Sequence, residues 1–425
     1  MKRNGDVYDI VIVGAGPAGL STAEVAARLG AKVFVLEKNS KIGVPIRTSG
    51  GSWIKYLDTL GTPHLLYHPV RKVRFISPHK EAIFEWKSPV FCALNVSGFY
   101  QFLAKKAVLA GAKIKLNSRV TKPILEDSYL VGVSYEDKNG PKKVGARLII
   151  DASGSSAIIA REIGLYGKLK RFAVGVEYEF FAPYYHEDET ILAVGNKIAP
   201  SGYGWAFPCG KKQVRVGVGI IRPDSLASPS KCLDYFLKQP YLKSGLKGAK
   251  KLEVHSGVIP SDGVRKSFIY NGLMVIGDAA NQASPLVGEG IRYAIESGKI
   301  AGRIAAQAVF SKNTSKNFLY RYECEWREKF GKTMSFAFEL NKEMASYKDK
   351  DWDEKTVLLS KLTAGQMAQL LKSNFSPFLA ISIFIMNPSL IKKIPSLLRY
   401  IKKAIYKKGA QSAMGKVFPA MKLMA

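Results

Sequence analysis

The sequence predicts an α/β protein: a Rossmann-type domain, an antiparallel β-sheet domain inserted within it, and a helical C-terminal region. Two segments predict the Rossmann-type domain, because each combines an apolar, strand-like run with a glycine turn that leads into a helix. They lie at residues 9–29 and 273–306, so this domain is discontinuous. Between them, residues 165–265 alternate apolar and polar positions and are divided by turns, which is typical of antiparallel strands.

The first glycine turn has the spacing of a dinucleotide-binding loop. Gly14, Gly16 and Gly19 follow the apolar run 9–13 and precede an Ala-rich helix at 20–29. In this arrangement the first glycine permits a tight turn, the second lets the backbone approach a pyrophosphate, and the third lets helix and strand pack closely. The N–H groups and the dipole at the start of the helix would bind the pyrophosphate.

A second predicted strand, residues 32–36, ends at Glu37. A carboxylate at this place accepts hydrogen bonds from the adenosine ribose and disfavours a 2'-phosphate, so NADP is not expected in this pocket. The glycine spacing alone could be a tight turn without a ligand. Here strand, loop, helix, second strand and terminal Glu occur in order, which favours a bound nucleotide.

The second glycine-marked segment indicates that the nucleotide is FAD. Gly277 and Asp278 follow the predicted strand 273–276, which places Asp278 to accept a hydrogen bond from a ribityl hydroxyl. A small-residue turn around Gly154, directly after a predicted strand, is expected to bring another backbone segment to the cofactor.

A glycine-punctuated loop that starts at Pro285 leads into a helix predicted for residues 291–306. Reduced flavin carries negative charge at N1 and the C2 carbonyl, which donors at a helix N-terminus stabilise. Gly288 and Gly290 are therefore expected at the flavin. Glu289 in this loop could donate a proton, but an exposed Glu at a helix start is the simpler interpretation.

The remaining segments complete three predicted domains. Further strands are expected at residues 71–94, 113–116, 129–135 and 143–150, and a further helix at 99–110. The FAD-binding domain is predicted to comprise residues 1–70, 95–164 and 266–325. The antiparallel β domain, which would hold the substrate, is predicted to comprise residues 71–94 and 165–265. The helical, basic C-terminal region is predicted to comprise residues 326–425.

The formal net charge of +30 predicts anionic partners. No Asp or Glu occurs after Glu354, and the basic tail follows an apolar run at 375–386 that is shorter than the roughly 20 residues of a spanning helix. An apolar helix followed by a Lys-rich amphipathic one suits the surface of an anionic bilayer. The alternative is a helical cap over the core with solvating lysines. No nucleic-acid recognition module is visible, so nucleic acid is not an expected partner.

The four cysteines are far apart and form no C-x-x-C pair, so we expect neither a metal site nor a disulfide framework. Lys2 and Arg3 precede an apolar run, as in a signal peptide, but this run is the first Rossmann strand and no cleavage site follows. The expected location is the cytoplasm, with the protein peripheral at the inner face of the membrane.

The order of these motifs resembles the flavoprotein superfamily that includes 4-hydroxybenzoate hydroxylase. Within it, Tyr203, Trp205 and Phe207, followed by Gly217, are similar to the Y-x-W-x-F-P…G signature of the geranylgeranyl reductase family, which includes archaeal digeranylgeranylglycerophospholipid reductases. The resemblance implies that hydride from flavin N5 saturates C=C bonds of isoprenoid chains in membrane lipids, chlorophyll or quinones. It also implies that these four residues form the substrate pocket.

Residue by residue, the resemblance implies FAD contacts at Ala18, Glu37, Thr48, Ser49, Gly51, Val120, Asp278, Gly290 and Ile291. Arg47 is a further candidate for the phosphate or the flavin, with a surface Arg as the alternative. The three rings alternate along a predicted strand and therefore share one face, where they could wall an apolar slot or simply form sheet core.

This chain departs from the family pattern at two places. Many relatives have a Cys near the flavin where this chain has Thr48 and Ser49, so thiol chemistry is not expected here. Val96 replaces a family Arg, so one charged FAD contact is missing. The chain has no second dinucleotide fingerprint, so the electron donor is either transiently bound NAD(P)H or a protein such as a ferredoxin.

Three functions therefore remain open. The first is an isoprenoid reductase at the membrane, and the second is an FAD-dependent aromatic hydroxylase or other monooxygenase. The third is a non-catalytic isoprenoid carrier, which would hold no flavin.

Overall fold

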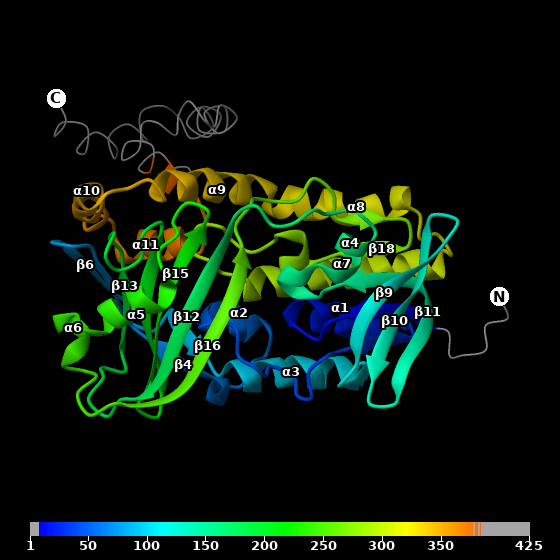
Figure 1. Cartoon of the computed structure of the whole chain (residues 1–425), viewed down its shortest axis with the longest axis horizontal. Helices are drawn as coiled ribbons and strands as arrows, with labels where there is room; N and C mark the ends of the chain where they lie inside the picture. Colours follow the sequence, from blue (N-terminus) through cyan, green and yellow to red (C-terminus); the bar gives the residue numbers. More distant parts are fainter. Residues whose placement is uncertain (1–7, 377–378, 381–382, 384–425) are drawn as a thin grey trace.

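The computed structural model describes residues 8–376, 379, 380 and 383. Its first sheet has eight strands and a central path in the order β17, β18, β11, β1, β2, β8. In Figure 1 the strands β9, β10, β11 and β18 of this sheet lie toward the right, whereas β6 and β13 of the second sheet lie at the left. Strands that are buried on both faces need apolar side chains throughout, and the Val- and Ile-rich runs supply them. The bounds along this path are β1 (Tyr8–Val13), β2 (Val33–Leu36), β8 (Lys113–Lys115), β11 (Gly140–Asp151), β17 (Ile269–Tyr270) and β18 (Leu273–Val275).

Strand β11 also carries an antiparallel extension made of β10 (Tyr129–Asp137) and β9 (Arg119–Glu126). The sequence predicted β10 and β11 but missed β9. Most β9 side chains are exposed or half-buried, so its hydrophobic alternation is weak.

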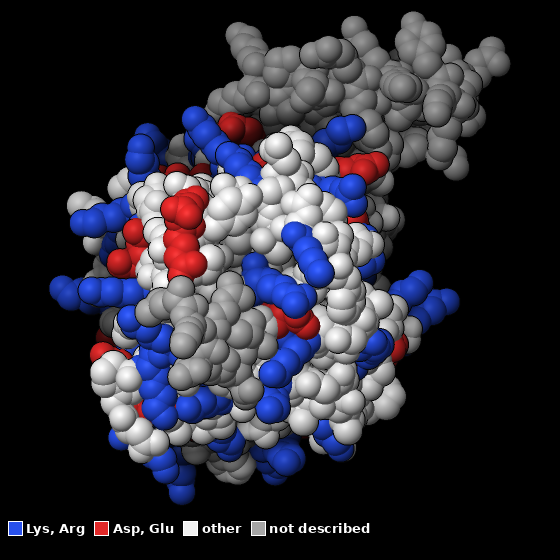
Figure 2. Space-filling model, turned by 90° about the vertical axis from the view of Figure 1, so that its right-hand side faces the viewer, with Lys and Arg blue, Asp and Glu red and all other residues white. Residues whose placement is uncertain are grey.

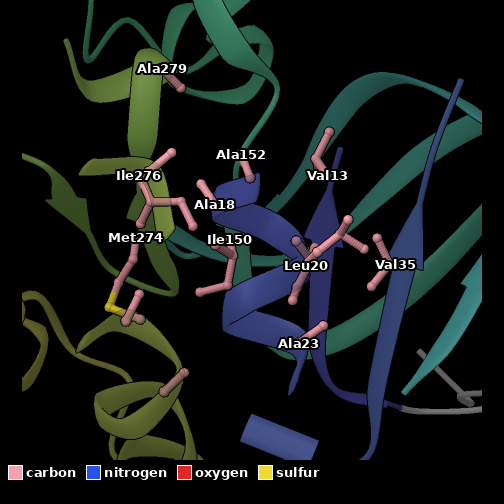
Figure 3. Close-up of a cluster of buried hydrophobic side chains, with 14 of the residues drawn as sticks. Val13, Ala18, Leu20, Ala23, Val35, Ile150, Ala152, Met274, Ile276 and Ala279 are labelled. Carbon is pink, nitrogen blue, oxygen red and sulfur yellow. The ribbon is translucent and has the colours of Figure 1, made fainter. Parts of the chain in front are cut away.

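Helices cover this sheet, and two of them cross at very short range. A Cβ at Gly298 would collide with the carbonyl oxygen of Ala18, so helices α7 and α1 approach backbone to backbone. Figure 3 shows Leu20 and Ala23 of α1 among the buried side chains that fill the space beside the strands. The helices of this half are α1 (Pro17–Arg28), α2 (Ile54–Thr59), α3 (Val96–Leu109), α4 (Ile158–Glu162), α7 (Ile291–Phe310) and α8 (Lys316–Trp326).

The second sheet has seven strands in the order β16, β12, β15, β14, β13, β5, β6. Its pairings are antiparallel except for β13 and β5, which are parallel. Helices α5 (Pro229–Leu237) and α6 (Pro240–Lys243), which the alternating pattern did not predict, pack against this sheet. The strands are β5 (Lys72–Ile76), β6 (Glu81–Glu85), β12 (Phe172–Phe181), β13 (Glu189–Ala193), β14 (Gly202–Gly210), β15 (Gln213–Arg222) and β16 (Lys250–Pro260).

A small third sheet consists of β3 (Gly51–Trp53), β7 (Phe91–Leu94) and β4 (Tyr67–Val70). Short 3-10 turns occur at His64–Leu66, Gly154–Ser156 and Gly277–Ala280. The architecture confirms the predicted α/β class, whereas the numerical domain limits stay a prediction.

After α8, the chain continues through a π-helical turn at Arg327–Gly331 into α9 (Lys332–Met344), α10 (Asp349–Leu359) and α11 (Ala364–Leu371). The apolar run predicted at 375–386 begins against α9, since the Phe375 and Phe336 rings meet edge to face at 4.4 Å. Leu379, Ala380 and Ile383 are buried in the same cluster. The basic amphipathic segment lies outside the described residues. Among the helices that the structure describes, none is both long and apolar enough to cross a membrane.

The basic composition is visible on the surface. Figure 2 shows one end of the molecule, where Lys and Arg side chains are spread across the face with few Asp and Glu side chains between them. The charge is therefore not confined to the C-terminal segment.

Candidate active site

The first glycine turn lies at the carboxyl end of β1. Gly14 has a φ of +104°, and a Cβ there would lie 2.5 Å from the Ala152 carbonyl oxygen, so the turn requires glycine. A Cβ at Gly19 would collide with the carbonyl oxygen of Gly14. A Cβ at Gly16 would meet no atom within 4 Å, so the backbone at Gly16 faces open space that a pyrophosphate can approach.

The start of α1 is also open to an anion. Its N-cap is Gly16, and no side chain caps its first N–H groups. Glu37 is buried at the end of β2 and accepts hydrogen bonds from the N–H groups of Ala15 (2.8 Å) and Asn39 (2.9 Å). It therefore fixes the glycine turn, and its oxygens keep lone pairs for a ribose hydroxyl.

The two glycine-marked segments meet in the fold. A Cβ at Gly277 would lie 2.9 Å from the Cβ of Ala18. Asp278 follows within a 3-10 turn, and its carboxylate faces the start of α7, 3.5 Å from a Cβ placed on Gly290. Burial raises the pKa of Asp278 to about 6, and no residue in the described part of the chain donates a hydrogen bond to its carboxylate. A desolvated acceptor without a donor fits a ribityl hydroxyl.

The loop from Pro285 to Ile291 lines a cavity, but Glu289 differs from the prediction. Its side chain is only 8% exposed, and both carboxylate oxygens accept from the Arg292 guanidinium at 2.7 Å. The interpretation of an exposed Glu is therefore wrong. Arg292 lies at the start of α7 and also donates to the Lys372 carbonyl oxygen, so this ion pair is enclosed beneath the C-terminal helices.

The cavity, with a volume of about 270 Å³, extends from this loop across one face of the seven-stranded sheet. Helices α5 and α6 pack on the residues of β15 that alternate with those facing the cavity. At the far end, α10 and α11 contribute apolar walls that sequence reasoning did not predict. These far walls are Trp352, Leu359, Met367, Leu370 and Leu371.

Tyr203, Trp205 and Phe207 all line this cavity from one face of β14. Successive ring centroids are 5.7 Å and 6.4 Å apart. The Tyr203 hydroxyl donates to the Val287 carbonyl oxygen at 2.6 Å, which joins the aromatic strand to the 285–291 loop. The three rings and this loop therefore form one continuous wall.

Gly217 lies beneath the Trp205 indole on the neighbouring strand β15, and it is Gly219 that lines the cavity itself. A Cβ at Gly217 would lie 2.5 Å from Trp205 Cζ2 and 2.7 Å from Cε2. Gly217 thus makes room for the indole to lie on the sheet.

Arg47, Thr48, Ser49 and Gly51 line the cavity beside the loop. Arg215 fixes the position of this segment through a hydrogen bond. The sequence did not predict this role of Arg215. Its buried guanidinium is ion-paired with Glu179 at 2.7 Å and donates to the carbonyl oxygens of Ser49 (3.1 Å) and Leu94 (2.9 Å). A charge at an inward position of a Val-rich strand was the signal that could have revealed it.

The predicted cofactor residues that do not line this cavity are Gly14, Gly16, Ala18, Gly19, Glu37, Val120, Gly154, Gly277 and Asp278. Val120 is buried on β9 opposite Tyr135. Gly154 follows β11 with a φ of +70°, and a Cβ there would meet no atom within 4 Å. Among the described residues, no cluster of His, Cys, Asp and Glu is arranged to hold a metal ion.

Comparison with known proteins agrees with this geometry. A family model for FAD dependent oxidoreductases matches residues 9–162, and one for the geranylgeranyl reductase catalytic domain matches residues 172–259. Digeranylgeranylglycerophospholipid reductase 2 of Methanopyrus kandleri is 31% identical over 92% of this chain and 100% of the relative. The chain belongs to the geranylgeranyl reductase family. It is therefore an FAD-dependent oxidoreductase.

Two further relatives support this assignment. The digeranylgeranylglycerophospholipid reductase of Methanococcus vannielii is 32% identical over 95% of this chain and 100% of the relative. A solved geranylgeranyl bacteriochlorophyll reductase-like protein from Thermoplasma acidophilum has a TM-score of 0.83 and 25% identity. That comparison covers 92% of this reductase and 99% of the solved chain. The resemblance inferred from the motifs is confirmed.

We expect Gly217→Ala to displace the Trp205 indole, because the new Cβ would overlap Cζ2. Turnover should fall by up to about 10²-fold, the loss that a displacement of about 1 Å in a packed site can cause. Intrinsic tryptophan fluorescence and steady-state kinetics measure the two effects. Gly145→Ala on β11 is the control, because it lies outside the cavity lining and its Cβ would meet only the Val131 carbonyl oxygen, at an ordinary 3.7 Å. Equal activity of the two variants would contradict this account.

Asp278 predicts a pH dependence of stability in the FAD-free protein. Because its pKa is raised, its contribution is fully present below pH 4 and is lost as the pH rises through about 6. The Asp278→Asn side chain cannot ionise. Between pH 4 and the pH range above 6, the free energy of unfolding of this variant, measured with urea, should therefore rise by roughly 2–3 kcal/mol relative to that of the wild type. Asp127→Asn, at an exposed turn residue, is the control. Parallel pH curves for wild type and Asp278→Asn would contradict the burial of this carboxylate.

Proposed function

We propose that this enzyme saturates the C=C bonds of the geranylgeranyl chains of a digeranylgeranylglycerophospholipid. The observation that carries the proposal is the cavity, which starts at the 285–291 loop, passes the rings of β14 and continues to α10 and α11. Its walls are mainly apolar over this length, as a polyprenyl chain requires and a small polar aromatic acid does not. The relatives named as reductases of this lipid align along nearly the whole chain.

Bound FAD, once reduced, supplies the hydride. The open backbone at Gly16, the uncapped start of α1 and the donor-free carboxylate of Asp278 support its placement between the two glycine-marked segments. The proposed FAD-binding residues are Gly14, Gly16, Ala18, Gly19, Glu37, Arg47, Thr48, Ser49, Gly51, Val120, Gly154, Gly277, Asp278, Pro285, Gly288, Gly290 and Ile291.

In the proposed reaction, the protein positions the substrate double bond and excludes water from it. An alkene has no polar handle, so it is held by shape alone, and catalysis depends on excluding water and fixing the double bond. Tyr203, Trp205 and Phe207 provide flat apolar walls directly beside the 285–291 loop. The substrate pocket proposed here consists of these three residues with Gly217 as the support of Trp205.

The partners and the location belong to the same proposal. A net charge of +30 and a tail without acidic residues after Glu354 support binding to the anionic inner surface of the cytoplasmic membrane, where the lipid substrate resides. The electron donor is either NAD(P)H in transient contact or a small redox protein, because the sequence carries a single dinucleotide fingerprint.

Anaerobic mixing of the reduced holoenzyme with digeranylgeranylglycerophospholipid tests the function. We expect flavin reoxidation and a lipid mass gain of two hydrogens per reduced bond, measured by mass spectrometry. An aromatic acid supplied with NADPH and oxygen is the control substrate and should stay unchanged. Hydroxylation of the aromatic acid, with the lipid unaltered, would contradict the reductase and support a monooxygenase. A colourless purified protein would support a non-catalytic carrier.

Replacing Lys392, Lys393, Lys402 and Lys403 with Ala tests the membrane surface. At about 1 kcal/mol per Lys, vesicle binding should weaken by roughly two orders of magnitude or more at low salt. Cosedimentation with phosphatidylserine-containing vesicles measures it. The matched control replaces four exposed lysines of the β8–β11 region, Lys113, Lys122, Lys138 and Lys143. Equal losses in both variants would show that only net charge matters.

A further inference from the structure

A buried polar chain crosses the sheet beneath the substrate cavity. Glu177 on β12 and His255 on β16 pair directly across the two strands, and both line the cavity. Glu177 is 3% exposed; it accepts hydrogen bonds from Trp205 Nε1 (2.6 Å) and from His255 Nδ1 (2.9 Å). His255 Nε2 lies 3.0 Å from a carboxylate oxygen of Glu253, whose side chain is 63% exposed. The chain thus runs from the cavity wall to solvent.

Saturating a C=C bond requires one proton for every hydride, and an apolar cavity supplies no water to deliver it. Two other ionisable groups on the described cavity wall, which lie at the 285–291 loop, are poorly placed for this task. Glu289 is locked in its bidentate pair with Arg292, and Tyr203 already donates to a carbonyl oxygen. Burial also raises the pKa of the Tyr203 hydroxyl. The hydrogen bonds of Glu177, in contrast, continue to an exposed carboxylate.

The electrostatics favour a proton on this chain. Burial alone would lower the pKa of His255, but its hydrogen bonds to Glu177 and Glu253 outweigh burial and raise the pKa, with Arg215 on β15 opposing. Arg47, from the segment next to Gly257, is a further cation on the same side of the cavity. His255 is therefore a proton reservoir between Glu177 and the surface.

We propose that Glu177 is the proton donor of the reaction and that His255 and Glu253 recharge it from solvent. The inference rests on the proposed reductase function. The O–H bond of the protonated carboxyl breaks, and its electron pair stays on Glu177. The π pair of the alkene forms the new C–H bond, and the hydride from reduced FAD completes the adjacent carbon. His255, which as an imidazolium carries a proton on both ring nitrogens, then passes its Nδ1 proton to Glu177. The neutral ring that remains takes up a proton from solvent through Glu253 after the ring turns its unprotonated nitrogen toward that carboxylate.

The position of Trp205 gives this step a second support. Its N–H donates to Glu177, so the indole is fixed with its ring along the cavity wall. Protonation of a trisubstituted alkene builds positive charge on the more substituted carbon, and the face of an indole stabilises a cation. The same side chain thus positions the acid and lies beside the developing charge.

The test is a single-turnover experiment with reduced holoenzyme and digeranylgeranylglycerophospholipid. Glu177→Gln keeps an acceptor for Trp205 but cannot donate a proton from a carboxyl group. Flavin reoxidation by the lipid should slow about 10²–10⁴-fold, the range for a lost general acid. FAD content and chemical reduction of the flavin should not change. Glu177→Asp should recover part of the rate, and Glu136→Gln, at an exposed position on β10, is the matched control.

A pH profile tests the recharging role of His255. The wild-type rate over repeated turnovers should fall as the pH rises through the pKa of His255, because the reservoir then loses its proton. His255→Gln should be slower and should lose this dependence, whereas the exposed His186→Gln should keep it. If wild-type enzyme reduces the lipid and Glu177→Gln does so at the same rate, the proton-donor role is wrong. If wild-type enzyme leaves the lipid unchanged, the proposed function itself fails.

Discussion

The close crossing of α1 and α7 is the constraint on which the rest of the structure depends. Gly298 allows the two helix backbones to touch, and Gly277 lies against Ala18 at the same crossing. The first turn of α1 therefore lies beside the first turns of α7, although Ala18 and Gly298 are far apart in the sequence. The pyrophosphate turn and the 285–291 loop could not serve one extended cofactor if larger side chains separated these helices.

A second set of contacts joins this cofactor side to the substrate sheet. Tyr203 donates to the 285–291 loop, and Arg215 donates to the Ser49 carbonyl oxygen of the 47–51 segment. Burying the Arg215 charge is costly unless it is paired, and Glu179 pairs it within the sheet. The sheet and the cofactor loops are thus fixed relative to each other by directional bonds, which apolar packing alone does not provide.

Sequence reasoning succeeded where the chemistry is local. Three features each lie within about ten residues of sequence, so their spacing predicts their geometry. They are the glycine turn, the strand that ends at Glu37 and the alternation of aromatic residues in β14. Glu177 and His255 are 78 positions apart and meet only through strand pairing, which a single sequence does not specify. Glu289 was misjudged for a similar reason, because its burial depends on helices that follow much later in the chain.

In the proposed mechanism, the apolar walls of the cavity bind the substrate, and the few polar side chains on the sheet serve the reaction. A geranylgeranyl chain offers no hydrogen-bonding group along its length, so in the proposed reaction its length and shape would be recognised by the rings of β14 and by the apolar walls of α10 and α11. Polar side chains on the sheet then contribute little to holding the chain, and burying them costs free energy. Glu177 and His255 nevertheless lie beneath Trp205, in a line that reaches solvent at Glu253. A reaction that consumes a proton at each double bond explains why polar side chains lie there.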